Sequence, residues 1–105
     1  FYRYGIYQVV TKYFRQFLDV YPYSSWAGQY ALNTIDGQPI VFEENDLLVV
    51  GSCSGSGNMK CDAIGRVAAA LYVNQAHALL YGSTDFRVSD LSLADRNVDP
   101  EKLII

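Results

Sequence analysis

The segment VVGSCSGSGNMKCDAIG, residues 49–65, joins an apolar strand to a helix through a loop of small residues. Three glycines and three serines occupy six of the seven positions 51–57, and Cys53 occupies the other. Such conformational freedom at a strand end is typical of a backbone that approaches another group closely. The free N–H groups and the positive dipole end of the helix would converge there, so we expect the loop to face an electron-rich group. Because Asp62 would oppose a full anion, a partial or delocalised charge suits the site better.

The pattern of the whole chain predicts an α+β fold in which two helices pack on a small, mainly antiparallel sheet. Apolar residues recur at helical spacing over residues 5–18, and a second helical pattern covers 61–80. Short apolar or alternating runs predict strands within 24–52, namely at 24–34, 40–42 and 46–52. The glycine loop then occupies 53–60, and a polar C-terminal tail covers 82–105.

Composition limits the classes of partner. The chain has 105 residues, of which 50% are hydrophobic and 14% aromatic, so it carries more apolar surface than a domain of this size can easily bury. We therefore expect some of this surface to meet another domain, a subunit or a ligand. The net charge of −3 argues against nucleic acid as a partner, because few Lys and Arg side chains are available to neutralise phosphates.

The two cysteines, Cys53 and Cys61, are separated by the flexible loop. No second cysteine pair completes a metal site with His77, so a zinc site is not expected. A disulfide could close the short loop, but reduced thiols in an intracellular protein are the favoured interpretation. The sequence contains no apolar run long enough to span a bilayer and no signal-peptide pattern.

The loop sequence is similar to two phosphate-binding motifs but matches neither of them completely. A P-loop requires Gly-Lys followed by Ser or Thr, but here Lys60 lies between Met59 and Cys61. The dinucleotide fingerprint GxGxxG fails because Lys60 stands at the position of its third glycine.

A third motif keeps an alternative open. GSCSG, residues 51–55, fits a nucleophile elbow in which Cys53 replaces the serine. In an elbow the helix follows the nucleophile directly, whereas SGSGN intervenes here. His77 would lie on the predicted helix more than three turns away, and no acid that would orient it stands out. A hydrolase using Cys53 is therefore the less favoured alternative.

Two segments together resemble the C-terminal region of the D-amino acid oxidase superfamily of FAD-dependent oxidoreductases. They are WAGQYALNTIDGQPI, residues 26–40, and LLVVGSCSGSGNMKCDAIGRVAAAL, residues 47–71. The family, which includes glycine oxidase, sarcosine oxidase and dimethylglycine dehydrogenase, has W-A-G, T-x-D-G-x-P-x-I, G-x-S-G-x-G and A-I-G-R motifs in this order. The matching positions are Trp26, Ala27, Gly28, Thr34, Asp36, Gly37, Pro39, Ile40, Ser54, Gly55, Gly57, Ala63, Ile64, Gly65 and Arg66.

The resemblance implies what the glycine loop faces. In this family the loop and the helix start lie along the pyrimidine edge of the flavin, so FAD is the implied cofactor and hydride transfer from an amine or amino acid is the implied reaction. The residues that would line the isoalloxazine are Gly55, Ser56, Gly57, Asn58, Met59 and Lys60.

The resemblance also implies a substrate pocket. Tyr30 stands where glycine oxidase-like members have an arginine that binds the substrate carboxylate, and Met59 stands where sarcosine oxidases have a lysine. Lys60 comes one residue late, so its side chain would point elsewhere. Tyr30 and Met59 are thus the implied pocket residues. Residues 86–105 resemble the dye-linked L-proline dehydrogenase branch of the family.

Members of the family begin with a Rossmann half that these residues do not contain. We therefore expect a single C-terminal fragment, residues 1–105, of a two-domain FAD-binding oxidoreductase fold, inactive alone. Its partners would be the Rossmann half, a small amine or amino acid and, in an oligomer, a second copy. Its expected location is the cytoplasm, or a membrane reached through the full-length enzyme. A non-catalytic interaction module with an aromatic binding surface is the alternative from another class.

Overall fold

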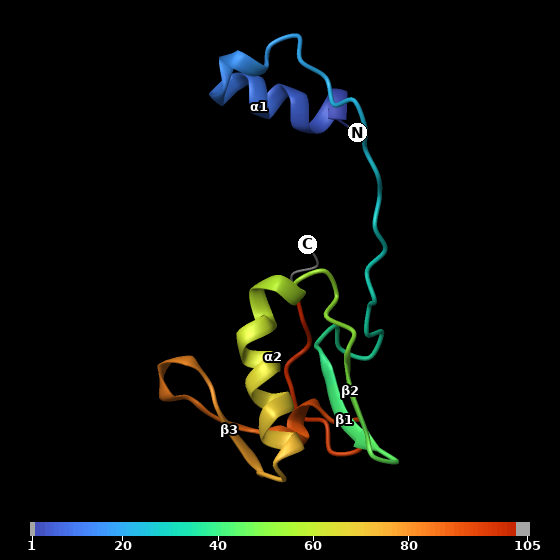
Figure 1. Cartoon of the computed structure of the whole chain (residues 1–105), viewed down its shortest axis with the longest axis vertical. Helices are drawn as coiled ribbons and strands as arrows, with labels where there is room; N and C mark the ends of the chain where they lie inside the picture. Colours follow the sequence, from blue (N-terminus) through green and yellow to red (C-terminus); the bar gives the residue numbers. More distant parts are fainter. Residues whose placement is uncertain (1, 103–105) are drawn as a thin grey trace.

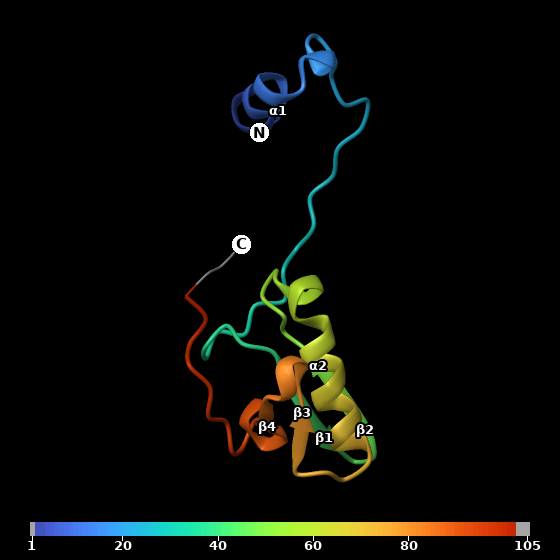
Figure 2. The ribbon, with the colours of Figure 1, turned by 90° about the vertical axis from the view of Figure 1, so that its left-hand side faces the viewer.

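The computed structural model describes residues 2–102, which form an N-terminal arm and a body joined by an extended segment (Figure 1). The arm comprises residues 2–28 and the body residues 29–102. The molecule is elongated, with principal extents of 55, 29 and 24 Å. Figure 2 shows the same separation from a second direction, so the arm helix stands apart from the body.

The arm contains three short helical pieces where the sequence predicted one helix over 5–18. They are the π-helix η1 (Tyr2–Ile6), the α-helix α1 (Tyr7–Tyr13) and the 3-10 helix η2 (Arg15–Phe17). The break follows Tyr13, because Phe14 has non-helical backbone angles, with φ −130° and ψ 83°. None of the three pieces buries a residue, so tertiary packing does not extend the helix.

The strand predicted at 24–34 is wrong. Residues 24–31 are extended without a partner strand, and pairing is confined to an isolated antiparallel bridge between Leu32 and Cys53. The residues have strand-like composition, but no neighbouring strand accepts their backbone hydrogen bonds.

The other two predicted strands are confirmed as a hairpin. β1 (Ile40–Glu44) pairs antiparallel with β2 (Leu47–Gly51), and Ile40 lies opposite Gly51. The turn residues Asn45 and Asp46 have φ of 52° and 62°. Two left-handed residues in a two-residue loop match the right-handed twist of a hairpin, and Asn and Asp tolerate that conformation.

The second predicted helix is shifted. α2 spans Gly57–Tyr72 rather than 61–80, so its first turn includes half of the predicted glycine loop. Its end is set by Asn74, which has φ 58°. The N–H of Asn74 donates to Leu71 O at 2.9 Å and that of Gln75 donates to Ala70 O at 2.8 Å. This is a Schellman motif with asparagine in the left-handed position.

The chain after α2 forms a second hairpin. β3 (His77–Leu79) pairs antiparallel with β4 (Asp85–Arg87) across the 3-10 helix η3 (Tyr81–Ser83), and η4 (Val88–Leu91) follows. The predicted polar tail is thus ordered and partly regular from 82 to 102, while 103–105 lie outside the described residues.

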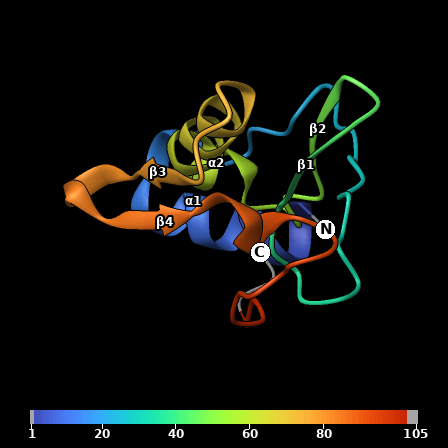
Figure 3. The same ribbon diagram turned by 90° about the horizontal axis from the view of Figure 1, so that it is seen from below.

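The α+β class is confirmed by α1, α2 and two small antiparallel sheets. In the body α2 packs on both sheets and η4 packs on β1, and Figure 3 shows the two hairpins spread to opposite sides of α2. The buried apolar side chains are contributed by β1, α2, β3 and η4: Val41, Ile64, Val67, Ala70, Ala78, Val88 and Leu91.

Candidate functional site

An open hollow of about 390 Å³ lies where the extended segment meets the glycine loop. Its walls come from residues 29–31, from loop residues 51–55, and from Gly57 and Asn58 at the start of α2. Residues 29–31, which follow the W-A-G motif, and the glycine loop therefore meet in one place, whereas Trp26, Ala27 and Gly28 do not line the hollow.

The loop has an unusual backbone. Ser52 and Ser54 adopt left-handed φ values of 57° and 50°, and Gly55 has φ 85°. Glycine adopts this region freely, whereas each left-handed serine costs on the order of 1 kcal/mol or more. Surrounding contacts hold the conformation, since Ser54 N–H donates to Ala31 O at 3.2 Å and Ser56 N–H donates to Cys53 O at 3.0 Å.

The start of α2 presents unpaired backbone donors to the hollow. The Ser56 hydroxyl donates to Cys53 O at 3.1 Å and so does not cap the helix. Ser56 O accepts the N–H groups of Met59 and Lys60, both at 3.1 Å. Among residues 2–102 the backbone N–H groups of Gly57 and Asn58 have no acceptor, as expected for a first helical turn. Both residues line the hollow.

Gly57 lies where the loop and the helix approach each other closely. A Cβ at this position would lie 3.1 Å from Cys53 Cβ and 3.6 Å from its Sγ. By contrast, a Cβ on Gly65, further along α2, would meet nothing within 4 Å. The two glycines therefore form a natural pair of test and control positions.

The residues assigned by resemblance separate into two groups. Tyr30, Gly55, Gly57 and Asn58 come together around the hollow. The other three lie outside its lining: Ser56 is buried at 4% exposure, Met59 is 67% exposed, and Lys60 turns to the C-terminal segment. Tyr30 and Met59, the two implied pocket residues, are thus not brought together at this hollow.

Lys60 has its own partners. Its Nζ lies 2.5 Å from Glu101 Oε2 and donates to Gln38 Oε1 at 3.2 Å. The side chain lines a different cavity of about 390 Å³, under the C-terminal segment. The resemblance implied that Lys60 lines the isoalloxazine, whereas here its side chain contacts Glu101 and Gln38.

The structure argues against the nucleophile elbow at Cys53. His77, the only histidine of the chain, lies on β3 rather than on the helix, and its Nδ1 is 2.6 Å from Asp85 Oδ2. An acid therefore does stand beside His77, contrary to expectation. Cys53 precedes α2 and His77 follows it, so a helix roughly 24 Å long separates them. Cys53 and Cys61 are both free thiols.

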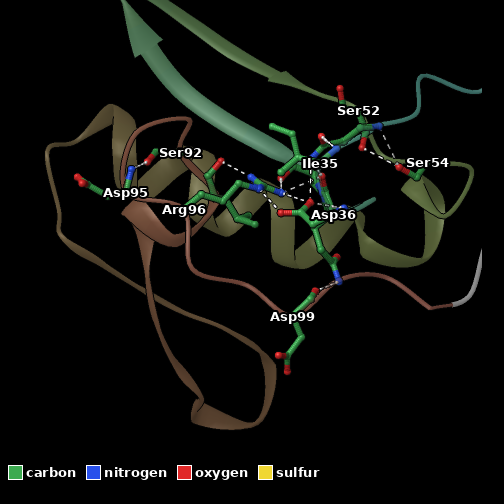
Figure 4. A network of polar contacts seen from close by, with 12 residues as sticks. Ile35, Asp36, Ser52, Ser54, Ser92, Asp95, Arg96 and Asp99 are labelled. Carbon is green, nitrogen blue, oxygen red and sulfur yellow. Dashed lines mark hydrogen bonds and ion pairs between the residues drawn. The ribbon is translucent and has the colours of Figure 1, made fainter.

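Sequence reasoning missed a largely buried ion pair between Arg96 and Asp36. Arg96 Nε and Nη2 donate to both carboxylate oxygens of Asp36, and the two side chains are each 9% exposed (Figure 4). The hydrogen bond from Arg96 holds the pKa of Asp36 below its usual value of 3.8, and the N–H of Gln38 adds to this effect. A separation of 60 residues leaves no local signal for the pair.

The pair is connected to the loop through Asn33. Asn33 Nδ2 donates to Asp36 Oδ1 at 2.8 Å and to Gln38 O at 3.0 Å. The backbone N–H of Asn33 donates to Ser54 Oγ at 3.4 Å. Figure 4 shows Asp36 between Arg96 and the loop residues Ser52 and Ser54.

Comparisons with known proteins found no match, either among protein families or among curated proteins. Within residues 2–102, no group of three or more His, Cys, Asp and Glu side chains is arranged to hold a metal ion. No helix in that same range has both the length and the apolar character needed to cross a membrane.

Proposed function

We propose that this chain is part of an FAD-dependent oxidoreductase that oxidises an amine or amino acid, and that the hollow at the glycine loop receives the edge of the flavin. One observation carries the proposal: residues 29–31, together with residues 51–55, 57 and 58, form the walls of one hollow, and they come from the two segments that resemble the family. The expected contacts of Gly55, Gly57, Asn58 and Tyr30 can then be made to a single group.

The residues present fit such a group. The N–H groups of Gly57 and Asn58 supply two donors at the positive end of a 16-residue helix. Gly55 has no side chain at its left-handed position, which allows a planar ring to approach the backbone there, and Gly57 allows the helix start to lie close to Cys53. The volume of about 390 Å³ falls in the range of small-molecule sites, and suits part of a large cofactor.

When bound, the flavin would supply the hydride acceptor. The chain's own residues would orient it and stabilise negative charge on its pyrimidine edge, because the donors at Gly57 and Asn58 are fixed before reaction. Tyr30 would form a wall of the same hollow. The adenine and pyrophosphate would be held by a Rossmann half outside these residues, and the free thiols suit a reducing cytoplasm.

The first test is a visible absorption spectrum of the purified protein, recorded with the denatured mass of every chain in the sample. A flavin band together with a longer or second chain would support the proposal. If the longer protein that carries these residues is purified without flavin and does not bind added FAD, the proposal is wrong.

The glycine pair then locates the flavin. Gly57→Ala should weaken FAD binding by about tenfold or more, since the new Cβ presses on Cys53 and displaces the donors, equivalent to roughly 1.4 kcal/mol. Gly65→Ala is the matched control on the same helix and should leave FAD affinity unchanged. Equal affinity in both variants would remove the loop from the cofactor site.

The exposed aromatic side chains of the arm favour a second candidate, a non-catalytic interaction module. Trp26 is 89% exposed, and Tyr4, Tyr13, Phe14 and Tyr21 are all more than half exposed. Such a module needs this surface but not the glycine loop. Partner binding that is lost on Trp26→Ala and kept on Gly57→Ala, with no flavin bound, would favour this candidate over the enzyme.

A further inference from the structure

The C-terminal segment 96–101 runs alongside the turn formed by residues 33–39 and reaches the first turn of α2. We name residues 96–101 the strap. Arg96 and Glu101 stand at its two ends. Arg96 pairs with Asp36, which precedes the glycine loop in the sequence, and Glu101 pairs with Lys60 in the first turn of α2. Gln38 Nε2 also donates to Asp99 O between them, at 3.2 Å.

The anchor before the loop is built on Arg96. Besides its two bonds to Asp36, Arg96 donates from Nη2 to Gln38 O and to Pro39 O, both at 3.0 Å. Its Nη1 donates to Leu91 O at 3.1 Å. The planar guanidinium thus ties the turn to η4 through several donors, a geometry that lysine cannot reproduce.

The turn formed by residues 33–39 connects Arg96 to the glycine loop through hydrogen bonds. Asp36 accepts Asn33 Nδ2, and Asn33 N–H in turn donates to Ser54 Oγ. Ser54 is 1% exposed and has a left-handed backbone, so its conformation depends on what surrounds it. Asn33 is therefore a direct link from the ion pair to the strained part of the loop.

The anchor after the loop is built on Glu101. Its carboxylate pairs with Lys60 in the first turn of α2, and its N–H donates to Asp36 O at 2.6 Å. The strap lies close here because Gly37 has no side chain: a Cβ would come within 2.9 Å of Glu101 Cβ. The strap consequently contacts the turn before the loop, through Arg96, and the first turn of α2 after it, through Glu101.

We propose that Arg96 is a positioning residue for the cofactor: through Asp36 and Asn33 it fixes Ser54, and with the Glu101–Lys60 pair it sets where the donors of Gly57 and Asn58 lie. This inference rests on the proposed function for its consequence at the flavin. The mechanical part of the proposal is that Arg96 fixes the conformation of the loop, and it depends only on contacts within this chain.

The mechanical part is tested without flavin by amide hydrogen exchange on the full chain. The reporters are the N–H of Ser54, which donates to Ala31 O, the N–H of Ser56, which donates to Cys53 O within the loop, and the N–H of Val67, a buried residue of α2. Arg96→Gln should accelerate exchange at Ser54 and Ser56 by about tenfold more than at Val67. Arg87→Gln, which removes a half-exposed arginine paired with Asp90, is the control and should not change that ratio.

Equal acceleration at all three amides would mean that Arg96 supports the body as a whole, and would overturn the proposal. If Arg96→Gln does not fold, Glu101→Gln replaces it, because this change keeps the shape of the side chain and removes the charge facing Lys60. It should accelerate Ser56 more than Val67, whereas Glu44→Gln at the hairpin turn should not. No difference between these two glutamate variants would equally overturn the proposal.

The consequence at the flavin is tested by FAD titration of the longer protein that carries these residues. Arg96→Gln should raise the Kd for FAD by about tenfold, a loss of roughly 1.4 kcal/mol, and Arg87→Gln should not change it. If the wild-type protein binds no FAD, the proposed function fails while the exchange ratio still decides the role of Arg96. If it binds FAD and Arg96→Gln binds it equally well, the positioning role is wrong.

Discussion

The arm and the body are both rich in apolar residues but differ in what their side chains contact. In the body, Val41 and Val67 are each 1% exposed within a core built from β1, α2, β3 and η4. In the arm, the three helical pieces bury no residue. Apolar character therefore does not by itself order a segment, because burial needs a second surface to pack against.

Polar contacts show the same difference. The arm is held by contacts between its own two ends: Tyr2 Oη donates to Val20 O at 3.1 Å, and Asp19 N–H donates to Tyr7 Oη at 3.1 Å. The Tyr7 and Tyr21 rings stack with centroids 5.5 Å apart. In the body, Arg96 reaches across 60 residues to Asp36. The contacts that close the body thus span up to 60 residues, whereas these contacts of the arm stay within residues 2–21.

The largest effect should come from opening the long-range ion pair. Arg96→Met leaves the Asp36 carboxylate buried without its partner and should lower the free energy of unfolding by about 3 kcal/mol. The matched change in the arm, Arg15→Met, alters an exposed arginine and should cost less than about 0.5 kcal/mol. Urea denaturation followed by circular dichroism measures both. Equal losses would show that the two regions do not differ as described.

A core truncation should have the next largest effect. Val67→Ala removes two methyl groups from the centre of the body and should cost roughly 2 kcal/mol. Val9→Ala makes the same chemical change in α1, where the side chain is 57% exposed, and should change stability by less than about 0.5 kcal/mol. Thermal unfolding of the two variants compares them directly. A loss in Val9→Ala as large as in Val67→Ala would mean that the arm packs on the body.

The contrast also separates what the sequence could and could not predict. The hairpin of β1 and β2 was predictable because its apolar runs flank Asn45 and Asp46, residues suited to a tight turn. The end of α2 also had a local signal, since Asn74 favours the left-handed position that stops a helix. Periodicity alone, extended through residue 80, hid that signal.

The remaining errors have a physical origin in distant contacts. The segment 24–34 has the composition of a strand, but pairing depends on a partner that periodicity does not reveal. The resemblance brought Tyr30, Gly55 and Gly57 to attention, and the structure places them around one hollow. Arg96 carried no such signal, because its partner Asp36 is distant in the sequence and the tail contains other Arg and Asp residues of the same type.

A smaller effect is expected from pH. Because the folded pKa of Asp36 is lowered, its ionised form stabilises the body. This contribution is complete above the unfolded pKa, near 3.8, and is lost as the pH falls through the lower folded pKa. The difference in unfolding free energy between wild type and Asp36→Asn should therefore be largest at about pH 6 and shrink in acid. Urea denaturation at several pH values measures it, and a difference that grows in acid would contradict the assigned pair.

The smallest effect is expected from removing the arm. Deleting residues 1–22 takes away η1, α1, η2 and the tyrosine cluster, but keeps Gln29 to Ala31 at the hollow. Since the arm contributes no buried side chain to the core, the melting temperature of the body should change by no more than a few degrees. In the longer protein that we propose, the same deletion should lower the melting temperature more. It removes most of the exposed aromatic side chains of the arm, which would pack against another surface there together with Trp26. A large fall in the isolated chain would instead show that the arm and the body are one folding unit.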